Sequence, residues 1–257
     1  MPAQYKLGNC YAYGLDIAED AAEAVKWWRK AAEKNHPEAL KVMGRSYDTG
    51  EGVAKDSTEA TKWYRKAAEL GGAQAQYDLG SRYFSGRGVV EDGLEALKWY
   101  RKAAEQNHAK AQCMIGFFYF NGFSVTKDSV TAVEWFRKAA EGGDAEGQTK
   151  LGDCYHKGQG VAKDYVEAVK WYLKAAEQDN VSAQLMLGSC YFSGQGVAKD
   201  NVEAYAWFNL VSRFAEASAK ARDTIEKVLS PQQIGDAQKR TKELRAQIEA
   251  KLKSGGK

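Results

Sequence analysis

The sequence repeats itself six times with a period of 36 residues and no slip. Each period contains a ladder glycine, and these are Gly8, Gly44, Gly80, Gly116, Gly152 and Gly188. Each also contains a ladder tryptophan, and these are Trp27, Trp63, Trp99, Trp135, Trp171 and Trp207. A fixed period of this length is typical of stacked repeat architectures. We therefore expect one elongated array whose repeats contact only their neighbours, although 257 residues would otherwise suggest one or two globular domains.

Each period predicts two helices joined by a tight turn, which we call helix A and helix B. In the second repeat, Ala39, Met43 and Tyr47 form an apolar stripe at helical spacing. Gly50 is expected to end helix A. Asp56 is expected to cap helix B, and its Asp-x-x-Glu spacing is an aspartate version of the capping box.

Glycine returns at fixed places in the frame. A glycine inside a helix costs about 1 kcal/mol relative to alanine, so the ladder glycine predicts close backbone approach by the paired helix. The first turn glycine, Gly86 in the third repeat, returns six times, which predicts a positive φ. The second, Gly88, is replaced by Asp16 and Ser124 in two repeats. Either its conformation is less restricted or those two turns differ.

These motifs resemble the Sel-1-like repeat family, a relative of the tetratricopeptide repeats. The resemblance rests on Leu-Gly-x-x-Tyr, Gly-x-Gly-Val-x-x-Asp and Ala-x-x-Trp-Tyr-x-Lys-Ala-Ala and covers about residues 1–214. It implies an all-α, right-handed α/α superhelical solenoid of six helix-turn-helix repeats and a role in protein–protein interaction. Some secreted members have paired cysteines within each repeat, and this chain lacks those pairs.

After the last ladder tryptophan the pattern decays. Thr224 stands where a seventh ladder glycine would fall, and Ser230-Pro231 has the N-cap and first-turn proline of a new helix. Lys220–Lys257 contains ten basic and five acidic residues, a net charge of +5. We expect residues 215–257 to form C-terminal capping helices with a polar outer face, ending in a disordered tail from Ser254.

The bulk properties exclude several function classes. The net charge of +3 gives no general case for nucleic acid or an anionic membrane, although the basic C-terminal helix keeps an acidic partner open. No run of 18 apolar residues predicts a transmembrane helix. Neighbouring helix pairs stack beyond disulfide reach, so we expect four free thiols, Cys10, Cys113, Cys154 and Cys190. No cysteine or histidine spacing predicts a metal site or cofactor.

Three patterns invite a chemical interpretation. The six aspartates from Asp20 to Asp200 could bind calcium, but their N-cap positions favour capping. His36, His108 and His156 lack a nucleophile–base arrangement, so we predict no enzyme activity. The Trp-Tyr pairs of helix B could stack on nucleic-acid bases. Their spacing matches the buried side of the helix, however, so we expect them to pack in the core.

The variable positions of the repeat indicate a recognition surface. Positions −3, +1, +4 and +5 from the ladder glycine are expected on the face of helix A turned away from helix B, which lines a concave groove in the tetratricopeptide relatives. Phe117 stands where sister repeats have polar residues, and we expect it to be an exposed anchor. The alternative is that these rings pack on one another. We predict the partner-binding residues to be Arg45, Tyr77, Ser81, Phe84, Phe117, Phe120, Asp153, His156 and Phe192.

The sequence therefore predicts a non-enzymatic, monomeric scaffold that binds a partner protein or peptide in its concave groove. Two alternatives remain: a self-assembling rod, or a hydrolase-related protein of the cell envelope. Ala3 falls where Ala39 falls in the next repeat, so the chain opens at the start of a first helix. A leader or earlier repeats could have been trimmed, which leaves the cytoplasm, the periplasm and secretion all open.

Overall fold

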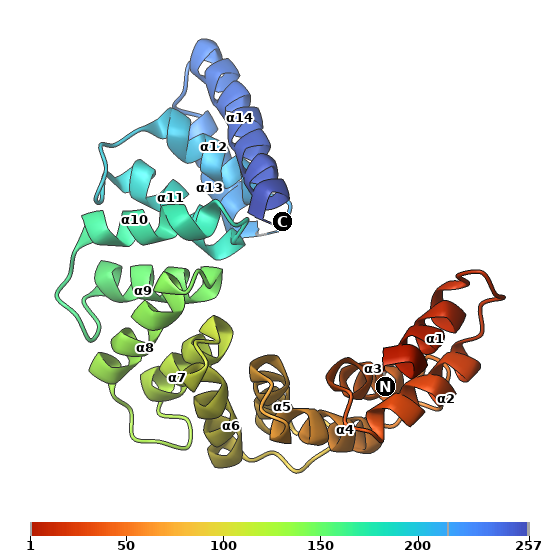
Figure 1. Cartoon of the computed structure of the whole chain (residues 1–257). Helices are drawn as coiled ribbons and strands as arrows, with labels where there is room; N and C mark the ends of the chain where they lie inside the picture. The colour runs from red at the N-terminus through yellow and green to blue at the C-terminus, as the bar shows by residue number, and fades with distance from the viewer. Residues whose placement is uncertain (1, 215, 256–257) are drawn as a thin grey trace. The chain divides into compact units, whose positions relative to one another are not determined.

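The structure is a computed structural model that describes residues 2–214 and 216–255, and these fold into fourteen helices (Figure 1). The six predicted helix pairs are α1 (Pro2–Tyr13) with α2 (Ala21–Ala32), α3 (Pro37–Thr49) with α4 (Ser57–Glu69), α5 (Ala73–Ser85) with α6 (Gly93–Glu105), α7 (Ala109–Asn121) with α8 (Ser129–Glu141), α9 (Ala145–Lys157) with α10 (Tyr165–Ala176), and α11 (Val181–Ser193) with α12 (Asn201–Val211). The chain continues with α13 (Glu216–Glu226) and α14 (Pro231–Gly255). The all-α, helix-hairpin architecture predicted from the period is confirmed.

The chain divides into two compact bodies within the fourth repeat. The N-terminal body contains the chain up to Phe118 with Gly122–Thr126, and the C-terminal body contains Tyr119–Asn121 with the chain from Lys127 onward. In each body the helices of a repeat pack as a hairpin, and helix B packs on helix A of the next repeat, as α4 does on α5 and α10 on α11. Each body is therefore built from the same two kinds of helix contact.

The ladder glycine lies against the ring of the residue that follows the ladder tryptophan. A Cβ added at Gly80 would lie 2.8 Å from the ring of Tyr100 and 3.1 Å from the backbone oxygen of Ala96. The same ring contact joins Gly8 to Trp28, Gly44 to Tyr64, Gly152 to Tyr172 and Gly188 to Phe208. The predicted close approach is confirmed, but a side-chain ring rather than the backbone is nearest.

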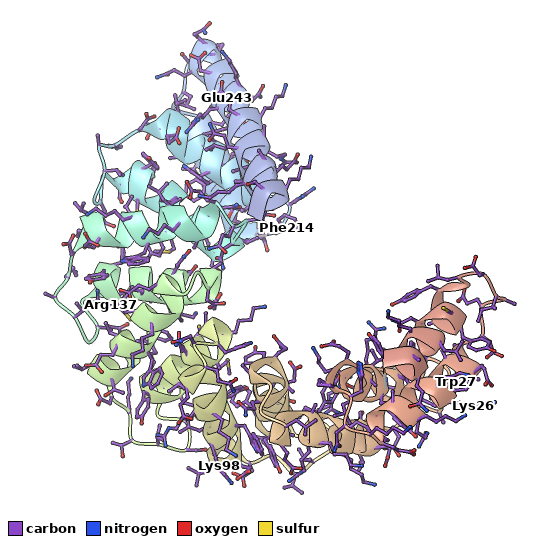
Figure 2. All side chains as sticks on the ribbon, viewed as in Figure 1. Lys26, Trp27, Lys98, Arg137, Phe214 and Glu243 are labelled. Atoms are coloured by element: carbon purple, nitrogen blue, oxygen red, sulfur yellow. The ribbon has the colours of Figure 1, made fainter. Side chains whose placement is uncertain are left out.

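The ladder tryptophans are less uniformly buried than predicted. Trp63, Trp99 and Trp207 are buried, whereas Trp27, Trp135 and Trp171 are half-buried. Figure 2 labels Trp27 on α2, and the ammonium of Lys30, one turn on, lies 4.0 Å from its ring centroid. A lysine covers the ring in the same way in the next four repeats. The core interpretation therefore applies best to the ring that follows each ladder tryptophan, because that ring fills the space beside the glycine.

The Asp-x-x-Glu spacing that recurs at the start of helix B forms only half of a capping box. Asp56 Oδ1 accepts hydrogen bonds from the backbone N–H groups of Thr58 and Glu59, at 2.9 and 3.0 Å, as predicted. The N–H of Asp56 instead donates to the carbonyl of Tyr47 on helix A, at 2.8 Å. The Glu59 carboxylate pairs with Lys62. The reciprocal hydrogen bond, from the Asp56 N–H to the Glu59 carboxylate, does not form because that N–H already donates to helix A.

The second turn position keeps one conformation in every repeat. Gly88 has φ +69°, and a Cβ there would lie 1.9 Å from the carbonyl oxygen of Ser57, the first residue of the preceding helix B. Asp16 and Ser124 also have positive φ, at 63° and 53°. The prediction of a less restricted position or a different turn is therefore wrong. Ser124 fits because its facing residue is Gly93, where a Cβ would lie 2.2 Å from Ser124 Oγ.

This compensation predicts a measurable coupling between Gly93 and Ser124. Gly93→Ala should lower the free energy of unfolding by about 1–3 kcal/mol, because the new methyl group overpacks against the serine side chain. In a Ser124→Gly background the same change should cost little. Urea unfolding of the wild type, the two single variants and the double variant measures the coupling energy. Additive effects within about 0.5 kcal/mol would show that the two positions are independent.

The C-terminal helices pack on α12. Trp207 and Val211 share one buried cluster with Leu244 and Ile248 of α14, and Phe208 shares another with Ile225 of α13. Ser230 caps α14 as predicted, since its Oγ accepts from the Gln233 N–H at 3.3 Å. The predicted boundary between the six repeats (1–214) and the capping helices (215–257) stays a prediction, because residue 215 lies outside the described residues.

The predicted disordered tail is partly wrong. Helix α14 extends through Ser254 and Gly255, while Gly256 and Lys257 lie outside the described residues. Contacts anchor this helix along its length: Arg240 pairs with Glu203 at 2.8 Å, and Lys251 pairs with Glu177. The helix is therefore held to α12 and to the C-cap residue of α10.

Candidate functional site

The predicted aromatic anchor in the N-terminal body is part of a ring cluster. Phe117 stacks on Phe123, with centroids 5.7 Å apart, and meets Phe84 edge-on at 6.2 Å. Phe118 is fully buried and lies 5.4 Å from Phe84. We call Phe84, Phe117, Phe118 and Phe123 the phenylalanine cluster. Phe117 and Phe84 are half-buried, so the expectation of an exposed Phe117 is wrong, and the alternative that these rings pack together holds here. The exposed ring is Phe123, at 46%.

The position after the ladder glycine faces helix B, contrary to the predicted face. Tyr100 OH donates to Ser81 Oγ at 3.2 Å, and Tyr172 OH donates to Asp153 Oδ1 at 2.8 Å. Burial raises the pKa of Tyr100 to about 12. Burial, followed by the Asp153 carboxylate, also raises the pKa of Tyr172. Ser81 and Asp153 are therefore the partners of buried tyrosines, and each is half-buried.

The remaining predicted residues of the N-terminal body differ in exposure. Tyr77 is half-buried and stacks on His108, with centroids 5.0 Å apart. The same histidine caps α7, since the Ala111 N–H donates to its Nδ1 at 3.2 Å. Arg45 is exposed. Of these two residues, only Arg45 has the accessibility that the prediction required.

In the C-terminal body the predicted residues occupy two places. Phe120 is half-buried over Phe136, with centroids 6.1 Å apart. His156 Nε2 lies 3.0 Å from Gln195 Oε1, and its ring meets Tyr165 edge-on at 5.0 Å. Phe192 is 41% exposed, and Lys199 Nζ lies 5.6 Å from its ring centroid. His156 and Phe192 come together at a cavity that the sequence did not reveal.

This cavity lies where α9, α11, α12 and α13 meet, and a second one lies at the equivalent place beside α3 and α5 in the N-terminal body. The apolar junction pocket, in the C-terminal body, has a volume of about 410 Å³ and is lined by His156, Met186, Ser189, Phe192, Ser193, Gln195, Phe208, Ala221, Thr224 and Ile225. The charged junction pocket has a volume of about 250 Å³ and is lined by Asp48, Tyr64, Asp78, Ser81, Arg82, Ser85 and Arg87. Asp48 and His156, Ser81 and Ser189, and Arg87 and Gln195 are each three periods apart. The repeat therefore places equivalent positions at both pockets with different side chains, and α12 and α13 complete the apolar one.

A buried ion pair in the wall of the charged junction pocket was missed by sequence reasoning. Arg82 is 5% exposed and Asp48 8%. The guanidinium donates to both Asp48 oxygens, at 2.7 and 3.0 Å, and Arg82 Nε donates to Thr61 Oγ1 at 2.6 Å. One sequence signal was present, because Thr61 is polar where sister repeats have Val25, Leu97, Val133, Val169 and Tyr205. A polar residue in a buried helix B position indicates a polar partner from the next repeat.

The charged junction pocket also contains a carboxyl group, that of Asp78, whose pKa is raised. Burial raises the pKa of Asp78, and a hydrogen bond from Gln74 and the charge of His108 oppose this shift. Burial likewise raises the pKa of Tyr64, helped by the Asp48 carboxylate. The lining of this pocket contains two aspartates and two arginines, whereas the lining of its apolar counterpart contains no Asp, Glu, Lys or Arg side chain.

Burial keeps two of the cysteines in the protonated form. Burial raises the pKa of Cys154 and of Cys190 to about 11, which keeps both as neutral thiols near pH 7. Within residues 2–214 and 216–255, no three His, Cys, Asp or Glu side chains are grouped to hold a metal ion. None of the helices in that part of the chain has the length and apolar character needed to span a bilayer.

Comparison with known proteins relates this architecture to a repeat family. The family model described as Sel1 repeat matches residues 2–36, 37–72, 73–108, 109–144, 145–180 and 181–210. The crystal structure of a Sel1 repeat protein from Oxalobacter formigenes is 39% identical, with a TM-score of 0.76, and the match covers 84% of this chain and 89% of that one. Comparison with curated proteins gives no match.

Two further solved structures are similar to the chain. A protective antigen present in uropathogenic Escherichia coli strains is 29% identical with a TM-score of 0.58, and the match covers 98% of this chain but only 62% of that protein. An immunity protein from Pseudomonas aeruginosa is 21% identical with a TM-score of 0.51 over 88% of this chain and 81% of that one, a likeness of fold alone.

Proposed function

The chain belongs to the Sel1 repeat family, and we propose that it is a non-enzymatic scaffold that binds a partner polypeptide along the helix A side of its repeats. The observation that carries this proposal is the junction pocket. Five equivalent frame positions contribute to a charged pocket in one body and to an apolar pocket in the other. A constant frame with a position-specific lining is suited to reading different side chains of one partner, because each pocket supplies separate chemistry.

The proposed surface differs between the two bodies. In the N-terminal body, Arg45 and the Phe123 ring of the phenylalanine cluster are exposed. Tyr77, Ser81, Phe84 and Phe117 support that surface from half-buried positions. In the C-terminal body the predicted residues of the proposed surface are Phe120, Asp153, His156 and Phe192. Aromatic residues and arginine are the residue types that most often supply binding energy at protein interfaces.

A selection from a displayed random-peptide library tests this function without knowledge of the natural partner. We expect peptides to be captured, and Phe123→Ser to weaken part of the captured set at least about tenfold, because a central aromatic contact is worth about 2 kcal/mol or more. Phe123→Ser also removes ring contacts with Phe84, Phe117 and Phe118, so binding is compared well below the melting temperature of the variant. Calorimetric titration of individual peptides measures the change.

The matched control is Leu94→Ser in the same body. Leu94 is 64% exposed and lies on α6, a B helix, so its removal should leave every captured peptide unaffected. Light scattering of the free protein should give the mass of one chain. An equal loss of binding in the two variants would contradict a surface on the helix A side, and a concentration-dependent mass would favour the self-assembling rod.

A further inference from the structure

The apolar junction pocket has an apolar floor and a polar rim. Phe208 of α12 and Ile225 of α13 are buried at its base, at 3% and 1% exposure, and Met186 is half-buried beside them. The rim includes His156 and Gln195, which are hydrogen-bonded to each other. None of its lining residues is Asp, Glu, Lys or Arg. The pocket is therefore suited to an uncharged group, because a charged one would lose its water without gaining a partner.

The repeat itself shows what fits at this place. Two periods earlier, the positions of Ser189, Gln195 and His156 are taken by Phe117, Phe123 and Phe84. In that junction the three rings contact one another, with centroids 5.7 to 6.2 Å apart. In the C-terminal body the corresponding side chains are smaller or polar, and a cavity of about 410 Å³ is open instead. The frame thus accepts aromatic rings here, and this junction does not supply them.

We propose that the apolar junction pocket binds one aromatic side chain of a partner polypeptide, taking the place that Phe117 and Phe123 fill in the fourth repeat. Phe208 and Phe192 offer ring edges and faces, and Met186 offers a polarizable thioether. The His156–Gln195 pair offers polar atoms for a phenolic hydroxyl or for the backbone of the bound segment. This inference names one subsite of the proposed function and rests on it for the polypeptide nature of the ligand.

The charged junction pocket is an internal contrast. Its lining contains Asp48, Asp78, Arg82 and Arg87, so an apolar ring would cover charged groups without satisfying them. Ring binding is therefore expected in the C-terminal body and not at the charged pocket. This difference allows the inference to be tested with small probes.

The test uses toluene and p-cresol, which reproduce the side chains of phenylalanine and tyrosine, with methylcyclohexane as the non-aromatic probe. Ligand-observed saturation-transfer NMR on the full chain should show that both aromatic probes bind. Ser189→Phe should weaken them at least tenfold, because the new ring occupies the cavity as Phe117 does in the fourth repeat. Ser189→Ala leaves the cavity open and should bind the probes as the wild type does. Gln195→Phe fills the cavity from the position equivalent to Phe123. If Ser189→Phe does not fold, the same loss of probe binding is measured with Gln195→Phe.

Several outcomes would overturn the inference. One is that neither aromatic probe binds the wild type, and another is that both bind unchanged after the cavity is filled. A third is that methylcyclohexane binds as tightly as toluene, which would indicate a general apolar ligand. The peptide selection is an independent arm: captured peptides sensitive to Ser189→Phe should share an aromatic residue. If no peptide is captured while the aromatic probes bind, the proposed scaffold function fails and the ring subsite remains.

Discussion

Arg82→Met is expected to lower the free energy of unfolding by about 3–5 kcal/mol, the usual cost of removing one partner of a buried ion pair. Methionine keeps much of the arginine volume, so the loss reflects the charge left behind rather than a cavity. Asp48 would lose both guanidinium hydrogen bonds and keep only the weaker ion pair with Arg87, at 3.5 Å. Urea unfolding followed by circular dichroism measures the change.

The matched control is Arg45→Met on α3, because Arg45 is exposed and such surface changes usually stay within about 0.5 kcal/mol. A similar small effect for Arg82→Met would show that the ion pair is open to water. The double variant Asp48→Phe with Arg82→Phe copies the next junction, where Phe84 and Phe118 occupy these positions 5.4 Å apart. It should recover most of the lost stability, because apolar replacement of a buried pair is often neutral or stabilising.

The helix hairpins and their caps could be predicted because they depend on local chemistry. An aspartate before a helix supplies an acceptor to free N–H groups, whatever lies elsewhere in the chain. Asp56 and Asp128 both cap in this way, although only Asp56 has a glutamate three residues on. The reciprocal capping box could not be predicted, because the Asp56 N–H is taken by Tyr47, a contact between two helices.

The prediction that position +1 of helix A turns away from helix B was wrong for a similar reason. Positions 1 and 4 after a ladder glycine are one turn apart, so the pattern alone places them on one face. In the structure, Ser81 receives the hydroxyl of Tyr100, whereas Phe84 contacts the next repeat. Two large rings follow each other on helix B, and the sequence did not show which one fills the space beside the glycine.

The junction pockets were invisible in the sequence because each combines several helices. The open and the filled junction differ at three equivalent positions, Ser189/Phe117, Gln195/Phe123 and His156/Phe84. The signal lies in comparing three positions across two periods rather than in any one residue. Phe117 was recognised as unusual, but its ring fills this junction instead of facing a partner.

Gly88→Ala is expected to lower the free energy of unfolding by about 2–5 kcal/mol. About 1–2 kcal/mol comes from forcing a side chain into the left-handed region, since Gly88 has φ +69°. A further cost of about 1–3 kcal/mol comes from overpacking, because the new methyl group would meet the Ser57 carbonyl oxygen at 1.9 Å. That atom belongs to the backbone of α4 and cannot move aside as a flexible side chain would.

Gly86→Ala in the same turn separates the two costs. Gly86 also has a positive φ, at +66°, but its added Cβ would have only ordinary contacts, the nearest at 3.5 Å. Its loss should therefore stay at about 1–2 kcal/mol, the cost of the left-handed backbone alone. Urea unfolding of the two variants gives the difference, which measures how tightly this turn is pressed against the preceding repeat. Equal losses would show that the turn relaxes freely, and that the second glycine returns for its backbone conformation rather than for the contact between repeats.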